Sequence, residues 1–165
     1  MTARNHAIAN LVADAVLERL NLIGKSADYQ WLTSPKWVGR GVSADFLNMP
    51  KPGLFLTTAG WGPSERFHLL TGSPGTALTA RCSAKFTVLM LADQSPAARE
   101  AEQELNDMAA DVMVAIETDY QLNHLLDTGW VHVEGYSPEV ELSGSGFATA
   151  SVELTATWLW TTDNP

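Results

Sequence analysis

Strict alternation between residues 78 and 90 constrains the fold more than any other feature of the sequence. The apolar or small residues at every second position are Leu78, Ala80, Cys82, Ala84, Phe86, Val88 and Met90. Successive side chains of a β-strand point to opposite faces of a sheet, so this pattern predicts one long strand buried on one side only. A strand of about thirteen residues exceeds the usual five or six, and we expect it to outrun the core of a small domain.

Other segments also have the pattern of strands. Residues Phe147 to Trp160 alternate in the same way and predict a second long strand, with a face rich in hydroxyl groups. Trp130 to Tyr136 predicts a shorter strand in which Trp130, His132 and Glu134 lie on one side, with Val131 and Val133 on the other. Short strands are expected at Leu54 to Thr58 and around Trp37 and Val38, with a short piece at Val140 to Leu142.

Two segments have the three-and-four spacing of an amphipathic helix. The first covers Thr2 to Ile23 and is followed by Gly24, a typical helix-ending residue. The second covers Ser95 to Thr118, where Ser95 can cap the helix and a proline occupies the first helical position. We expect both helices to pack on the apolar side of the sheet. The acids of the second helix, including Asp107 and Asp111, are predicted to form a solvated face and not a metal site.

The order of these segments predicts a single domain over residues 1–165, of the α+β class. Its sheet is expected to be mainly antiparallel, with two long strands and with the helices packed on one face. Residues 25–53 form a long irregular segment rich in aromatic residues. We expect it to cover a surface of the same subunit, with a surface of a neighbour as the alternative. Residues 60–76 are predicted to be a loop or hairpin tip, because Gly and Pro residues bracket a short apolar patch there. The Gly- and Pro-containing run at 72–76 is not a phosphate-binding loop, because it lacks the Gly-Lys-Ser/Thr ending.

Composition excludes several classes of protein. The net charge is −9, with 10 Lys and Arg against 19 Asp and Glu, which argues against a nucleic-acid binder. Cys82 is the only cysteine, so no internal disulfide forms, and its place on the apolar side predicts a core residue. No apolar run approaches the roughly 20 residues needed to cross a membrane. Since Met1 to Asn10 has no apolar core resembling a signal peptide, we expect a soluble protein that is cytosolic at synthesis.

The sequence has none of the usual catalytic or metal-binding patterns. The histidines, His6, His68, His124 and His132, are scattered without zinc-site spacing. No nucleophile elbow and no dinucleotide fingerprint is present. The sequence therefore predicts no catalytic residue, no cofactor and no metal, and favours a structural or assembly protein. An enzyme with an unrecognised site is the alternative.

The second half of the chain, taken as a unit, resembles a known family. Its parts are the run Leu78-Thr-Ala-Arg-Cys-Ser-Ala-Lys-Phe-Thr-Val-Leu-Met-Leu91, the Ser95-Pro-Ala-Ala-Arg-Glu start of an Ala-rich helix, and Gly146-Phe-Ala-Thr-Ala-Ser-Val-Glu-Leu-Thr-Ala-Thr-Trp158. This order of strand, helix, connector and final strand resembles the tail terminator proteins of tailed bacteriophages. The N-terminal helix and the Pro-marked approach to Leu54-Phe-Leu are similar to the opening of that family.

The resemblance implies a non-enzymatic ring, usually a hexamer, that caps the phage tail tube and ends its polymerisation. Such a ring forms the tail-side surface for head joining. The implied partners are other copies of the chain, the tail tube protein, a neck connector or stopper protein, and the sheath protein if the tail is contractile. DNA would pass through the channel without specific binding, and no membrane is involved. The implied location is the virion tail or neck, with the host cytoplasm during assembly. The alternative is a head-tail connector or stopper protein of the neck.

Three places are predicted to form the assembly interface. Large aromatic residues are favoured at protein interfaces, and the polar sides of the long strands do not need the helices to cover them. The alternative to an interface is that the polar side of the strands is a sheet face exposed to solvent. The predicted interface residues are Trp61, Phe67 and Leu69 in the loop, Trp31 and Trp37 in the irregular segment, and Arg81, Lys85 and Glu153 on the strands.

Overall fold

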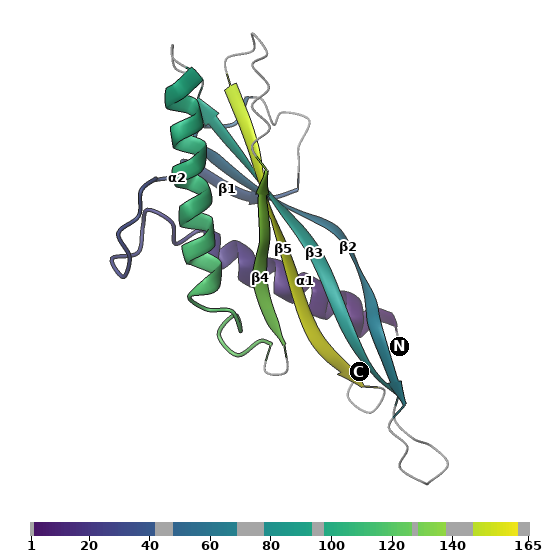
Figure 1. The fold of residues 1–165 in the computed structure, drawn as a ribbon. Helices are drawn as coiled ribbons and strands as arrows, with labels where there is room; N and C mark the ends of the chain where they lie inside the picture. The colour runs from purple at the N-terminus through teal and green to yellow at the C-terminus, as the bar shows by residue number, and fades with distance from the viewer. Residues whose placement is uncertain are drawn as a thin grey trace.

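The described residues form a five-stranded sheet with two helices, as Figure 1 shows for the computed structural model. The structure describes residues 2–41, 48–68, 78–93, 98–126, 129–137 and 147–161. In chain order the elements are α1 (Thr2–Leu20), β1 (Trp37–Arg40), β2 (Gly53–His68), β3 (Leu78–Asp93), α2 (Ala98–Glu117), β4 (Trp130–Ser137) and β5 (Phe147–Thr161). The predicted α+β class is therefore confirmed.

The sheet is mixed, with strand order β1-β2-β3-β5-β4. β3 and β5 pair antiparallel over nearly their whole length, and β2 and β4 pair antiparallel with these two strands. β1 instead pairs parallel with the start of β2, so the sheet is not purely antiparallel. A parallel pair needs a connection that returns the chain to the same end of the sheet, and residues 41–52 provide it.

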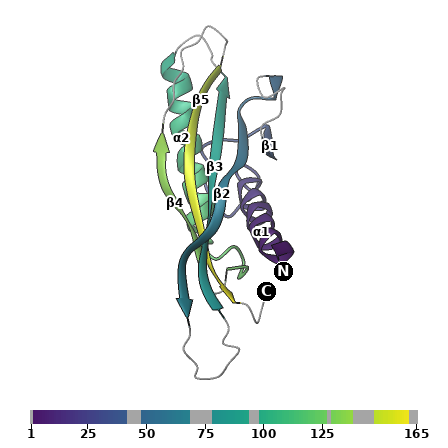
Figure 2. The same cartoon turned by 90° about the vertical axis from the view of Figure 1, so that its right-hand side faces the viewer.

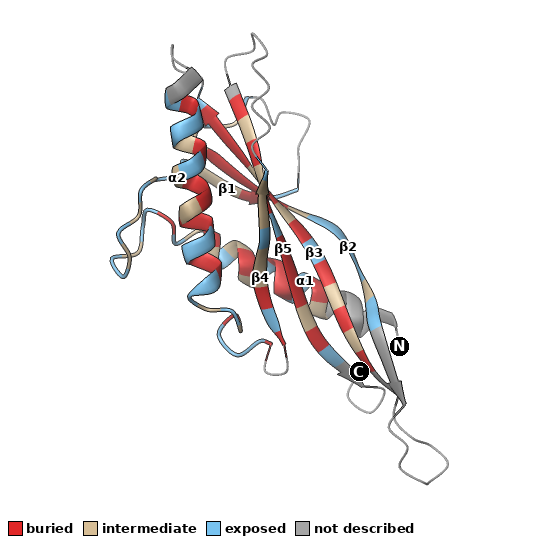
Figure 3. Cartoon of the chain, in the orientation of Figure 1, coloured by how far each residue is buried: buried red, intermediate tan, exposed pale blue. Residues whose placement is uncertain are grey.

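The two predicted long strands pair with each other, and the helices pack on their apolar side. The even-numbered residues from Cys82 to Ala92 in β3 and from Ala148 to Trp158 in β5 share one core with residues from both helices. Figure 3 shows the buried residues of α2 on its side toward the sheet. Val12, Val16 and Leu20 of α1 and Leu105 and Met108 of α2 are fully or almost fully buried in this core. Cys82 is buried among them, as predicted.

β2 differs most from the sequence prediction. It has 16 residues and continues to His68. The prediction of a loop over residues 60–76 is therefore wrong for residues 60–68. The strand continues because β3 offers it a partner along its full length. Two register shifts, between Thr58 and Gly60 and between Pro63 and Glu65, absorb the residues that fit a ladder poorly. The sheet therefore has a third long strand.

Helix boundaries agree with the prediction to within a few residues. α1 ends at Leu20, and hydrogen-bonded turns follow up to Gly24, whose φ is +74°. A Cβ atom at this glycine would lie 2.8 Å from the Thr33 carbonyl oxygen, so both its conformation and its surroundings require glycine. The predicted cap at Ser95 and the predicted strand at Val140 to Leu142 lie outside the described residues.

The irregular segment after α1 is held to α2 by one buried carboxylate. Asp111 is 2% exposed and accepts hydrogen bonds from the backbone N–H groups of Leu32 and Thr33 and from the Thr33 hydroxyl. The prediction that Asp111 lies on a solvated face is therefore wrong. Helical periodicity placed this acid off the apolar stripe, but it gave no sign that a distant segment would supply donors. No described helix is long and apolar enough to cross a membrane.

Candidate functional site

Both helices pack on one face of the sheet, so neither of them covers the other face. In Figure 2 the strands β4, β5, β3 and β2 lie side by side in front of α2, so this view looks onto the face away from that helix. We call the side away from the helices the outer face; it carries the odd-numbered residues of β3 and β5. This is the polar side predicted from the alternation.

One end of the outer face is apolar and closed. Phe55 and Leu91 are fully buried there, outside the main core. The Trp37 ring lies 4.5 Å from the Phe55 ring, measured between centroids. A Cβ atom at Gly39 would lie 1.9 Å from the Trp37 ring, so the indole lies directly over this glycine. The Trp37 side chain thus packs against residues of its own chain.

The other end of the outer face is polar and open. The Arg81 guanidinium of β3 reaches across β5 and lies 5.7 Å from the centroid of the Trp130 ring on β4. Leu159 is directly opposite Arg81 in the register. Trp130 and Leu159 are 42% and 39% exposed. Tryptophan and arginine side chains are enriched in protein interfaces.

A second contact crosses the same three strands. The Thr155 hydroxyl donates a hydrogen bond of 2.6 Å to Glu134, and Lys85 Nζ lies 3.8 Å from the other oxygen of that carboxylate. The register shift between Val133 and Gly135 places Glu134 at this position. The Thr155 hydrogen bond, followed by the charge of Lys85, holds the pKa of Glu134 below its ordinary value despite some desolvation.

A shallow groove adjoins this region and reaches β2. The groove has a volume of about 250 Å³, and Trp61 lines it together with Ser83 and Lys85 of β3. We call Arg81, Lys85, Trp130, Glu134 and Leu159 the outer-face cluster; it extends from β3 to β4. Trp61 is opposite Ala84 of the main core in the register, so the register does not place its side chain on the outer face.

Two of the predicted interface residues, Arg81 and Lys85, thus belong to one surface. Trp61 lines the adjoining groove on β2 and lies outside the cluster. Glu153 is exposed on the same strand as Thr155, opposite Thr87, and outside the cluster. Trp31 is separate: its Nε1 donates to the Ser26 carbonyl oxygen, and its ring packs against Tyr29 and the core.

The two remaining predicted interface residues were placed in a loop. Phe67 lies in β2, paired with Thr79, and Leu69 lies outside the described residues. Trp31 and Trp37 confirm the expectation that the irregular segment covers its own subunit, as far as these two side chains are concerned.

The sequence reasoning did not select Trp130, Glu134 or Leu159 as site residues. A signal was present for the first two, because alternation in β4 placed Trp130 and Glu134 on the side opposite the valines. What alternation could not show is that β4 pairs with β5 and so lies within reach of β3.

The edges of the described sheet are poorly suited to adding another strand. On β4, the N–H of Val131 donates to the Tyr120 carbonyl oxygen, and the N–H of Val133 donates to the Glu117 carboxylate. On the other side, β1 pairs only with Gly53–Leu56, and the continuing edge of β2 contains two register shifts and Pro63. Such features discourage edge-to-edge pairing, which leaves the outer face as the larger assembly surface.

Among the described residues, no group of three or more His, Cys, Asp or Glu side chains is placed to hold a metal ion. Burial raises the pKa of the Cys82 thiol, which keeps it in the less reactive protonated form. No protein-family model matches the chain, and no curated protein sequence matches it.

Proposed function

We propose that this chain is a structural subunit of a ring that caps a phage tail tube. The ring ends tube polymerisation and forms the tail-side surface for head joining. The observation that supports an assembly role is the outer-face cluster, where exposed Trp130 and Leu159 lie beside the charged side chains of Arg81 and Lys85. Tryptophan and arginine are the residues that most often dominate binding energy in protein interfaces.

The proposal of a tail terminator rests on the order of the elements, which resembles the order in that family. A long strand, a helix, a connector and a final long strand follow one another, and the two long strands pair antiparallel. The proposed partners are other copies of the chain in a ring, usually of six, the tail tube protein, a neck connector or stopper protein, and the sheath protein if the tail is contractile. The proposed location is the virion tail or neck.

The charge of the chain is consistent with DNA passing through such a ring. A chain with a net charge of −9 offers few positively charged side chains for DNA phosphates to bind. Binding strength grows with the number of phosphates that Lys and Arg neutralise, so an acidic passage lets the duplex slide. We propose no specific DNA contact.

Electron microscopy of the purified protein, with and without tail tubes, tests the proposal. We expect rings that cap one end of the tube only, and a phage lacking the protein should produce tubes of uncontrolled length. Normal-length tubes and joined virions in its absence would refute the terminator function. Free, correctly terminated tails would instead identify a connector or stopper protein of the neck.

A further inference from the structure

A groove lies on the opposite side of the molecule from the outer face, between α1 and the turn that follows α2. We call it the α1 groove; it has a volume of about 410 Å³. Leu11 and Leu125 line it and are 51% and 40% exposed. Its polar lining includes the carboxylates of Asp14 and Glu18. The α1 groove is thus an apolar depression with an acidic rim.

One wall of the α1 groove has an unusual backbone. Leu122, Asn123 and His124 have φ angles of 51°, 55° and 67°, in the left-handed region that side chains other than glycine rarely adopt. The Asp119 carboxylate accepts the N–H of Asn123 and helps to hold this turn. Backbone strain of this kind persists only where surrounding structure maintains it, and it is concentrated at functional sites. This wall of the groove is therefore held in place by the surrounding structure.

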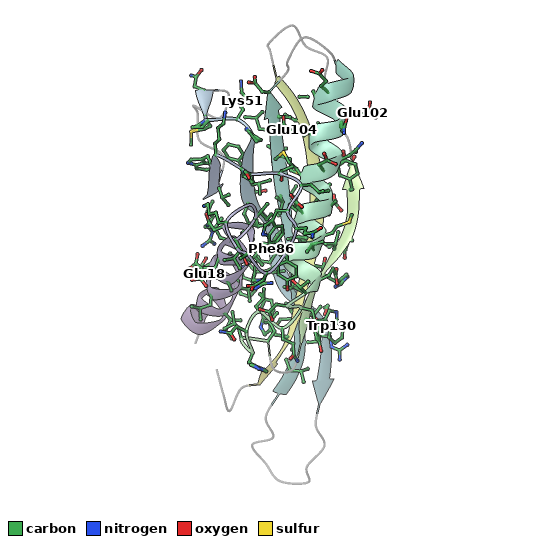
Figure 4. All side chains as sticks on the ribbon, turned by 90° about the vertical axis from the view of Figure 1, so that its left-hand side faces the viewer. Glu18, Lys51, Phe86, Glu102, Glu104 and Trp130 are labelled. Carbon is green, nitrogen blue, oxygen red and sulfur yellow. The ribbon has the colours of Figure 1, made fainter. Side chains whose placement is uncertain are left out.

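The two sides of the molecule are complementary in polarity. Glu18 belongs to α1, which packs on the core side of the sheet, whereas Trp130 lies beside Arg81 in the outer-face cluster. Figure 4 labels both residues. The outer-face cluster offers an exposed indole, two cations and the Glu134 carboxylate. The α1 groove offers exposed leucines, the Glu18 carboxylate and Asp14, which is paired with Arg40. Two different surfaces on opposite sides of one chain are what a head-to-tail ring requires.

We propose that the α1 groove of one copy receives the Trp130 end of the outer-face cluster of a second copy. The inference rests on the proposed function, and it identifies which two surfaces of neighbouring subunits meet. Trp130 packs against Leu11 and Leu125 of the neighbour, and Lys85 faces the neighbour's Glu18.

Charge supports this choice of occupant. Copies of a chain with a net charge of −9 repel one another unless a local basic surface meets an acidic one. The Lys85 side chain is 66% exposed and only loosely paired with Glu134, at 3.8 Å. Glu18 is exposed and forms no ion pair within the described part of the chain. Both groups are therefore available for a contact between copies.

A charge-reversal cycle tests the contact. Glu18→Lys and Lys85→Glu are made singly and together, and the dissociation constant between copies is measured by sedimentation velocity over a range of concentrations. We expect each single reversal to weaken association about tenfold or more, and the double reversal to restore most of the loss. Glu102→Lys on the exposed side of α2 carries the same change in charge and serves as the matched control, which should associate as the wild type does.

The outcomes separate this contact from the function. Wild-type protein that remains monomeric at every soluble concentration, single reversals without effect, or a double reversal that fails to recover would each overturn the contact. Rings that still cap tubes in the single variants would overturn it while leaving the tail-terminator function in place. Recovery of association in the double variant without any capping of tubes would instead leave the contact standing and refute the function. Circular dichroism of each variant checks that folding is unchanged.

Discussion

The carboxylate of Asp111 accepts both the backbone N–H and the hydroxyl of Thr33, at 2.8 and 2.6 Å. These two residues are far apart in the sequence, and their contact fixes the irregular segment after α1 against α2. Removing a buried acceptor leaves its donors unsatisfied, which costs more than the hydrogen bonds themselves contribute.

We therefore expect Asp111→Ala to lower the free energy of unfolding by about 3 kcal/mol. Urea denaturation measures the loss. Asp107→Ala, one turn earlier on α2 and partly exposed, is the matched control and should change stability by less than about 0.5 kcal/mol. Equal losses for the two variants would contradict the structural role assigned to Asp111.

Arg19 of α1 should stabilise the end of α2. Its Nε donates to the Ala115 carbonyl oxygen and a terminal nitrogen donates to the Thr118 hydroxyl, while α2 has no basic residue in its own last turn. A cation there complements the negative end of the helix dipole. We expect Arg19→Met, which keeps most of the apolar stem, to lose about 1 to 2 kcal/mol of unfolding free energy in thermal or urea melts. Stability equal to the wild type would show that the Arg19 contacts contribute nothing.

The outer-face cluster should respond to acid through Glu134. Its pKa is lowered in the folded protein, first by the Thr155 hydrogen bond. A lowered folded pKa adds stability above the pKa of the unfolded state, and that stability is lost as the pH falls through the folded value. The loss therefore falls below pH 4.5, the ordinary value for glutamate.

Thr155→Val tests this linkage. We expect the pKa of Glu134 to rise toward its ordinary value, as followed by NMR titration of the side-chain carboxyl group. The acid-dependent loss of stability should shrink accordingly. An unchanged titration curve would rule out the Thr155 hydrogen bond as the main cause.

Two tryptophans should behave in opposite ways. Trp31 packs against the core, so Trp31→Ala should cost about 3 kcal/mol of unfolding free energy. Trp130 is exposed on the outer-face cluster, so Trp130→Ala should cost about 1 kcal/mol or less. Association between copies should be lost in the Trp130 variant, measured by sedimentation velocity beside urea melts of both proteins. A Trp130 variant that associates normally would exclude this residue from the assembly interface.

Periodicity predicted the parts of the fold that depend on local pattern. The strict alternation in β3 and β5 and the helical spacing in α1 and α2 were sufficient to locate these elements and the class. The pairing of the strands could not be predicted in this way, because it depends on residues that are distant in the sequence. The parallel pairing of β1, the continuation of β2 past Gly60 and the burial of Asp111 all depend on partners that no local pattern reveals.

The same distinction applies to the candidate site. Arg81 and Lys85 were selected because alternation placed them on a polar side, and Trp61 because it is aromatic. Trp130 and Glu134 join the first two only because β4 folds back along β5, which brings three strands within reach of one side chain.

The edge of β4 has a consequence for the proposed role in ending the growth of a tail tube. Glu117 and Tyr120 occupy the backbone donors of Val133 and Val131 that a further strand would use. A subunit with a free edge could recruit copies of itself without limit and would replace one polymer by another. Because these two donors are already used, the ring that we propose has to close through contacts between the faces of its subunits, and a closed circle of copies is a dead end for growth.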